Sequence, residues 1–254
     1  ARPIPRLPPV TRAVFPARLS MGDRTRAGAL RQEGREGLAD DAGYNPTVAF
    51  ITFEGIEGSG KSTQLGLAAE RLGARAVVTK EPGGTAIGRA LREVLLDPAS
   101  RDLTPMAELL LYFADRAQNV AEVVRPGLDE GRVVLCDRYV ESSLAYQGWG
   151  RGLSREAILS LAELATGGLR PDLIVLLDLP VEEGLARVGR RGSHDRLESE
   201  KGTFHQRVRE GYLELMDAEP ERWLRLDATA EPGTVFARLW EALEARNLTG
   251  GRES

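Results

Sequence analysis

The chain has 254 residues, of which 42% are hydrophobic, and a formal net charge of −4 at neutral pH. This length is typical of one large α/β domain, and the mildly acidic balance argues against a surface that binds nucleic acid or anionic membranes. No apolar run approaches the roughly 20 residues that cross a bilayer. The single cysteine, Cys136, excludes an internal disulfide framework and fits a reducing compartment. We therefore expect a soluble, cytoplasmic protein with one folded domain.

The first 46 residues differ in composition from the rest of the chain. Residues 1–35 carry eight arginines against two acidic residues, and no apolar periodicity is present. We expect either a disordered tail or a gene start placed upstream of the true one, at Met21 or later. A transit peptide is the third alternative, although the segment has no clean amphipathic helix. The folded domain is expected over 47–246 and a flexible tail over 247–254.

From Thr47 onward, short aliphatic runs alternate with longer segments of helical period. This alternation is typical of a three-layer α/β fold, with a five-stranded, mostly parallel sheet and helices on both faces. Nearly continuous aliphatic runs also indicate strands that are covered on both faces. The predicted strands are 48–54, 75–80, 132–137, 172–179 and 222–228, and the predicted helices are 61–72, 85–96, 105–130, 154–166, 181–189, 203–217 and 231–246.

The first predicted strand runs into "GIEGSGKS" (55–62), which ends where the next helix begins. In that context the pattern G-x-x-x-x-G-K-[ST] predicts a phosphate-binding loop. Its glycines let backbone N–H groups turn inward around an anion, and the helix adds its positive N-terminal end. Lys61 would reach the β- and γ-phosphates, and the Ser62 hydroxyl would ligate Mg²⁺. The residues expected to hold the nucleoside triphosphate are Gly55, Ile56, Glu57, Gly58, Ser59, Gly60, Lys61, Ser62 and Thr63.

A phosphate-binding loop alone does not distinguish a switch from a motor or a kinase. The guanine-specificity motif Asn-Lys-x-Asp is absent, because none of the three lysines follows an asparagine. The stretch "CDRY" (136–139) instead puts Asp137 and Arg138 at the carboxyl end of a strand, where ligands bind in open α/β sheets. Asp137 would hold Mg²⁺ through water, and Arg138 would hold a second phosphate group. Asp178, at the end of another strand, remains the alternative metal-site residue.

The segment "AELLLYFADRAQNV" (107–120) contains five consecutive apolar residues, 109–113. Five consecutive positions circle an α-helix completely, so we expect this helix to be buried on all sides, in the core or at a subunit interface. Tyr112 and Arg116 are four residues apart and share one face. A ring beside a planar guanidinium group is suited to binding a flat base. The residues by themselves therefore predict a nucleotide phosphotransferase.

Six stretches occur in a fixed order: "FITFEGIEGSGKSTQ", "TKEPGGT", "LREVLLD", "LLLYFADR", "DRYVESSLAYQGWGRG" and "DRLE". Together they resemble the bacterial thymidylate kinases, a family of P-loop nucleoside monophosphate kinases, over about residues 49–246. The resemblance implies transfer of the ATP γ-phosphate to dTMP with Mg²⁺, and a homodimer. A kinase for another nucleoside monophosphate or for a deoxynucleoside, and a non-catalytic nucleotide-binding module, remain as alternatives.

The resemblance also implies roles in binding the acceptor dTMP. Glu57 would face the 3′-hydroxyl of the sugar, Arg92 and Arg138 would hold the phosphate, and Tyr146 would exclude ribonucleotides at the 2′ carbon. Tyr112 stands where the family usually has a phenylalanine that stacks on thymine. Arg116, on the same face of the helix, would hydrogen-bond the base. The full set implied for dTMP is Glu57, Arg92, Tyr112, Arg116, Arg138, Ser143, Tyr146 and Gln147, and the set implied for the metal is Ser62 and Asp137.

The stretch "ARVGRRGSHDRLE" resembles the mobile lid of the family, at about 186–200. Arginines of a closing lid can neutralise charge on the transferred phosphoryl group. Because Gly58 stands where some relatives have an arginine, we expect the lid to supply that charge. The implied catalytic residues are Lys61, Arg138, Arg190, Arg191 and Arg196.

Two positions depart from the family pattern. Lys80 stands where an arginine is common, and His205 stands where a second aromatic residue is usual. Neither His205 nor His194 lies near cysteines or an acidic cluster at the spacing of zinc ligands, so no zinc site is expected. We expect both histidines on the surface.

Overall fold

A computed structural model describes residues 48–190 and 195–249, all of them within one unit, Asn45–Ser254. The expected leader over 1–46 therefore lies outside the described residues, as do Arg191 and His194. Among the helices of the described ranges, none combines the length and the apolar character that a membrane span requires.

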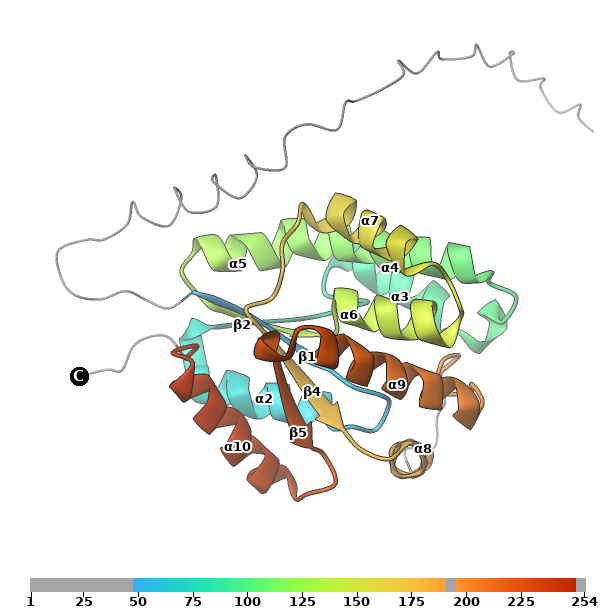
Figure 1. Cartoon of the computed structure of the whole chain (residues 1–254). Helices are drawn as coiled ribbons and strands as arrows, with labels where there is room; N and C mark the ends of the chain where they lie inside the picture. Colours follow the sequence, from blue (N-terminus) through green and yellow to red (C-terminus); the bar gives the residue numbers. More distant parts are fainter. Residues whose placement is uncertain (1–47, 191–194, 250–254) are drawn as a thin grey trace, which may run out of the picture. The chain divides into compact units, whose positions relative to one another are not determined.

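The centre of the fold is a sheet of five parallel strands in the order β2-β3-β1-β4-β5 (Figure 1). Parallel pairing throughout brings the carboxyl ends of the strands to one edge of the sheet, where ligands bind in open α/β folds. The sheet agrees with the expected fold class. Its strands are β1 (Ala49–Glu54), β2 (Ala76–Lys80), β3 (Val133–Asp137), β4 (Leu173–Asp178) and β5 (Trp223–Asp227).

Burial differs between the central strands and the edge strand β2. Every residue of β1 and β4 is buried, as their aliphatic sequences predict. In β2, however, Val78 is 52% exposed. The expectation that this strand is covered on both faces is wrong, because the helices cover the centre of the sheet more completely than its edge.

Helices cover both faces of the sheet (Figure 1). On one face α2 packs against α10, and on the other η3 and α5 contact β2 and β3. Helix α4 lies between α3 and α7, and α9 packs against α6 and η4. The bounds are α2 (Lys61–Leu72), α3 (Ala86–Leu96), α4 (Pro105–Asn119), η3 (Val120–Val124), α5 (Arg125–Asp129), α6 (Val140–Ser143), η4 (Leu144–Gly150), α7 (Arg155–Thr166), α8 (Val181–Gly189), α9 (Gly202–Ala218) and α10 (Pro232–Ala245).

Two helical regions differ from the sequence-based expectation. The helix expected over 105–130 is divided, because the π-helical stretch η3 separates α4 from α5. The sequence pattern predicts no element over 140–150, yet α6 and the π-helical stretch η4 occupy it. Two glycines, Gly148 and Gly150, interrupt the apolar period there, and contacts with α9 compensate for their low helix propensity.

The apolar run on α4 is only partly buried. Leu109 and Phe113 are buried, whereas Leu110 is 49% exposed. Helices α3 and α7 contact α4, and the side of α4 that carries Leu110 stays exposed. The prediction of burial on all sides is therefore wrong within a single chain.

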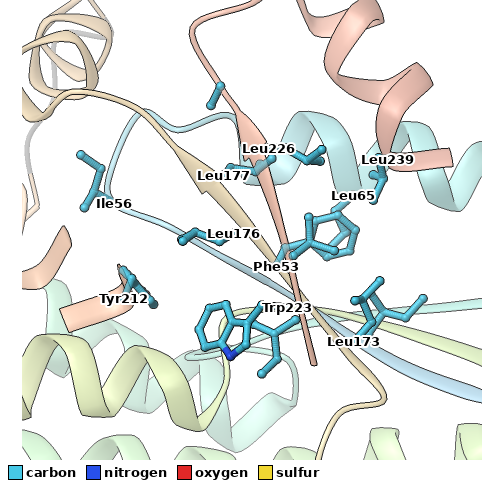
Figure 2. Close-up of a cluster of buried hydrophobic side chains, with 14 of the residues drawn as sticks. Phe53, Ile56, Leu65, Leu173, Leu176, Leu177, Tyr212, Trp223, Leu226 and Leu239 are labelled. Carbon is cyan, nitrogen blue, oxygen red and sulfur yellow. The ribbon is translucent and has the colours of Figure 1, made fainter. Parts of the chain in front are cut away.

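The main hydrophobic core lies between the sheet and the helices that cover it (Figure 2). Phe53, Leu177 and Leu226 come from three neighbouring strands, and Leu65 of α2 and Leu239 of α10 pack against them. Burial of side chains this large contributes about 1.5–3 kcal/mol each. This packing fixes the strand ends, and the loops that follow them, on which the candidate site is built.

Candidate active site

A cavity of about 730 Å³ lies at the carboxyl ends of the strands, a size that suits nucleotide-sized ligands. The residues implied for dTMP all line it: Glu57, Arg92, Tyr112, Arg116, Arg138, Ser143, Tyr146 and Gln147. It is also lined by the implied metal residues, Ser62 and Asp137, and by the loop residues Gly58, Ser59, Gly60, Lys61 and Thr63.

The loop between β1 and α2 has the backbone shape of an anion cradle. Gly60 has φ 88° and is followed directly by the N-terminus of α2, whose positive end therefore faces the cavity. Gly58 has φ 73°, and a Cβ there would clash with the backbone oxygen of Gly184 on α8. An arginine at position 58 would therefore require α8 to move.

Lys61 is folded against this loop. Its Nζ donates hydrogen bonds to the backbone oxygens of Gly55, at 3.0 Å, and Ile56, at 2.9 Å. Burial, followed by the positive charge of Arg138, lowers the pKa of Lys61 to about 8. The ammonium group therefore keeps its proton at neutral pH, and nearby phosphates would raise the pKa again by favouring the charged form.

Of the two aspartates considered for the metal site, the structure places Asp137 beside Ser62 and Asp178 elsewhere. Ser62 Oγ donates to Asp137 Oδ2 at 3.0 Å, because α2 begins beside the end of β3. Asp178 does not line the cavity; its oxygens accept hydrogen bonds from Arg209 at 2.7 Å and Arg225 at 2.6 Å. The hydroxyl and carboxylate at the loop are hard oxygen donors of the kind that Mg²⁺ prefers.

Arg138 lines the cavity and has a strained backbone conformation. Its φ is 74°, a left-handed backbone that costs a residue with a side chain about 1–2 kcal/mol. Its Nη2 donates to Glu57 Oε1 and to the Tyr146 hydroxyl, each at 3.0 Å. Its Nη1 donates to the hydroxyls of Ser142 and Tyr212, each at 3.2 Å. These contacts offset the strain and aim the guanidinium group into the cavity.

Glu57 forms an ion pair with Arg138. Burial raises its pKa, but contact with His205 and the charges of Arg138 and Lys61 outweigh burial and lower the pKa to about 2. The lowered pKa means that the ionised carboxylate stabilises the folded protein above about pH 4.5. This contribution to stability is lost as the pH falls from about 4.5 to about 2. Glu57 is therefore ionised throughout the physiological range.

His205 is not a surface residue, contrary to the expectation from sequence. Its side chain is 1% exposed, and Nδ1 lies 3.1 Å from Glu57 Oε2. It occupies the same face of α9 as Val208 and Tyr212, which are also buried. This spacing of three and seven residues is a helical signal that would have indicated burial.

The side of the cavity expected to hold the base contains a buried ion pair that sequence reasoning missed. Arg116 donates through Nε to Glu81 Oε2 at 2.7 Å, and both side chains are 1% exposed. The other donors of Arg116 contact Ser143 Oγ at 3.0 Å and the Tyr139 backbone oxygen at 2.7 Å. Glu81 directly follows the end of β2. Glu81, like Asp137, lies at the carboxyl end of a strand, and this position is the sequence signal that would have identified it as a site residue.

The lid arginines do not all face the cavity. Arg190 is exposed at the end of α8, and Arg191 lies outside the described residues. Arg196 is buried away from the cavity lining, where Nε donates to the Leu95 backbone oxygen at 2.8 Å and Nη2 lies 2.7 Å from Glu108 Oε2. Arg187, on α8, does line the cavity and donates to the backbone oxygen of Ala228 at 2.9 Å.

Comparisons with known proteins identify the family to which the chain is similar. A family model described as thymidylate kinase matches residues 53–239. The thymidylate kinase of Desulfovibrio desulfuricans is 51% identical over 213 residues, which cover 80% of this chain and 98% of that protein. The thymidylate kinase of Deinococcus radiodurans is 54% identical over 200 residues, which cover 78% and 97%. The crystal structure of thymidylate kinase from Ehrlichia chaffeensis is similar with a TM-score of 0.66 at 30% identity, covering 78% of this chain and 100% of that chain.

Proposed function

The chain belongs to the thymidylate kinase family and phosphorylates dTMP to dTDP, and from this premise we propose how its residues divide the work. We assign the triphosphate of ATP to the loop over 55–63 and dTMP to the part of the cavity around Arg138 and Tyr146. One observation carries this assignment: Lys61 and Arg138 line the same cavity, and Glu57 influences both of them electrostatically. Two anionic substrates can then meet between two cationic side chains.

Mg²⁺ is proposed at Ser62 and Asp137. The oxygen chemistry of this pair and its 3.0 Å separation support the assignment. When bound, the ion would neutralise charge on the β- and γ-phosphates. The chain itself holds the hydroxyl and the carboxylate in place from the start of α2 and the end of β3.

The chemical step demands alignment and charge neutralisation rather than a strong base, because the acceptor phosphate oxygen is already anionic near neutral pH. Lys61 and the amides of the loop would hold the transferred phosphoryl group. Arg138, with Arg92, would hold the acceptor phosphate in line with it. Closure over the cavity would exclude water as a competing acceptor.

We propose different roles for the arginines of the lid. Arg187 lines the cavity and lies near the loop, so it is placed to contact ATP. Arg196 would act at a distance, since it holds the segment after the lid against Leu95 and Glu108. Arg190 and Arg191 remain the proposed catalytic arginines on the strength of the resemblance alone.

An acceptor panel tests the proposed function. Purified protein with ATP, Mg²⁺ and, in turn, dTMP, dUMP, dCMP, AMP, GMP and thymidine is expected to turn over dTMP with the highest kcat/KM, measured by coupled ADP release. Omission of Mg²⁺ should abolish turnover, and ATP without an acceptor should be hydrolysed only slowly. A higher kcat/KM with any other acceptor would overturn the assignment of the pocket, and full activity without a divalent ion would overturn the metal site.

We also propose that the protein works as a homodimer in the cytoplasm. Apolar side chains are exposed on three helices that pack beside one another: Ile87 and Val94 on α3, Met106 and Leu110 on α4, and Leu159 on α7. Exposed apolar surface shared by neighbouring helices is characteristic of protein interfaces. A second copy is the proposed partner, since the same face on each subunit satisfies two-fold symmetry.

Substitution of Leu110 tests the dimer. Leu110→Asp is expected to convert the protein from dimer to monomer in sedimentation velocity at micromolar concentration, because it places a charge within the apolar face of each subunit. Val48→Asp, at a partly exposed valine outside these helices, is the matched control and should stay dimeric. A monomeric wild type, or a Leu110→Asp variant that stays dimeric, would contradict the proposed interface.

A further inference from the structure

His205 places a polar ring where burial is nearly complete. Its side chain is 1% exposed, yet the mechanism above gives it no task. It packs edge-on against Phe204, with ring centroids 5.4 Å apart, and Phe204 in turn lies edge-on to Tyr146 at 6.1 Å. This turn of α9 therefore reaches the acceptor side of the cavity.

The two oxygens of Glu57 have different partners. Oε1 accepts hydrogen bonds from Arg138 Nη2 at 3.0 Å and from the Tyr146 hydroxyl at 2.6 Å. Oε2 is buried and forms no hydrogen bond within the described residues, although Nδ1 of His205, which is also unpartnered, lies only 3.1 Å from it. A carboxylate held at one oxygen can still turn about its terminal C–C bond. A hydrogen bond to the second oxygen would fix the plane of the group.

The chemistry of the pair defines the state of the ring. Glu57 is ionised, since its pKa lies at about 2. A nitrogen lone pair that faced a carboxylate oxygen at this distance would be repelled. The close approach therefore requires the proton on Nδ1, and a small rotation of the ring would align that N–H with Oε2. A phenylalanine at this position would preserve the packing but leave Oε2 buried without a donor, which costs about 1–3 kcal/mol unless the carboxylate turns away.

We propose that His205 is a positioning residue that holds the Glu57 carboxylate in the orientation that recognises the 3′-hydroxyl of the acceptor sugar. This inference rests on the proposed function and on the contact with the 3′-hydroxyl that the resemblance to the thymidylate kinases implies for Glu57. A histidine at this position adds a polar group of α9 to the two groups, on Arg138 and Tyr146, that already contact the carboxylate.

The test compares dTMP with 3′-deoxy-dTMP as acceptors. His205→Phe is expected to lower kcat/KM for dTMP by about tenfold, which corresponds to one lost charge-assisted hydrogen bond. The loss should fall on KM for dTMP, with kcat and the KM for ATP within about twofold of wild type. Phosphorylation of 3′-deoxy-dTMP should be unchanged, since that acceptor lacks the hydroxyl. His205→Asn, whose Nδ2 can replace the Nδ1 donor, should restore most of the preference for dTMP.

The preference is the ratio of kcat/KM for the two acceptors on one preparation, so it does not depend on the fraction of folded protein. A purely structural role would lower both acceptors equally in His205→Phe, with no rescue by asparagine, and that result would overturn the inference. Glu57→Gln separates the two levels. If it leaves the preference intact, the role of Glu57 itself is wrong. If it abolishes the preference while His205→Phe retains it, only the positioning role of His205 fails.

Discussion

Replacement of Lys61 by alanine is expected to lower kcat by about 10³-fold, the order of effect seen when a group that stabilises transition-state charge is removed. The Lys61 ammonium lies among the loop carbonyls at the end of the cavity assigned to ATP, so its charge acts where negative charge accumulates. Steady-state kinetics with dTMP and ATP give the measurement. In the wild-type enzyme, KM for ATP should also rise above about pH 8, as Lys61 loses its proton.

Lys201→Ala is the matched control, because Lys201 is exposed at the start of α9 and does not line the cavity. It removes the same side chain and should leave kcat within about twofold of wild type. A Lys61→Ala enzyme that retained more than a tenth of wild-type kcat, with an unchanged melting temperature, would contradict the role of the loop lysine.

Replacement of Arg138 should separate catalysis from stability. Both Arg138→Ala and Arg138→Gly are expected to lower kcat/KM for dTMP by about 10²–10³-fold, because each removes the guanidinium group assigned to the acceptor phosphate. The two variants should differ in stability. Arg138 has φ 74°, so glycine relieves backbone strain that alanine retains.

Urea unfolding at equilibrium measures that difference. The glycine variant should be more stable than the alanine variant by about 1 kcal/mol, after allowing for the greater entropy of glycine in the unfolded chain. Because both variants lose the same contacts with Glu57 and Tyr146, their difference reports the backbone alone. A glycine variant less stable than the alanine variant by about 0.4–1 kcal/mol would show that the positive φ carries no strain, because only the entropy of glycine in the unfolded chain would then separate them. An alanine variant with normal kcat/KM would remove Arg138 from the acceptor site.

The fold was accessible from sequence because its signals are local. A nearly uniform aliphatic run is compatible with a strand covered on both faces, and each of the five runs forms a strand in the sheet. The exceptions have tertiary causes. Val78 and Leu110 are apolar by type but exposed by position, and the segment 140–150 is helical because it packs against α9.

The residues of the site also divide into those that a local sequence pattern predicts and those that only the fold brings together. The pattern from Gly55 to Ser62 specifies its backbone shape through glycines and its charge through Lys61, so spacing alone predicts phosphate binding. The strand-end position of Asp137 and Arg138 adds the second half of the cavity. By contrast, no local pattern links Glu57 to His205, which lies more than a hundred residues away in the chain.

By itself the sequence determined the class of fold, the phosphate-binding loop and the nucleotide phosphotransferase chemistry, because each depends on residues that are neighbours along the chain. Only the tertiary structure placed Asp137, and not Asp178, beside Ser62 at the cavity, moved His205 from the surface to the interior, and paired Glu81 with Arg116. Those outcomes depend on which side chains from distant segments share a buried space. Burial makes an unpaired charge costly, so the charged groups that meet there must match, and that matching is a property of the packed fold.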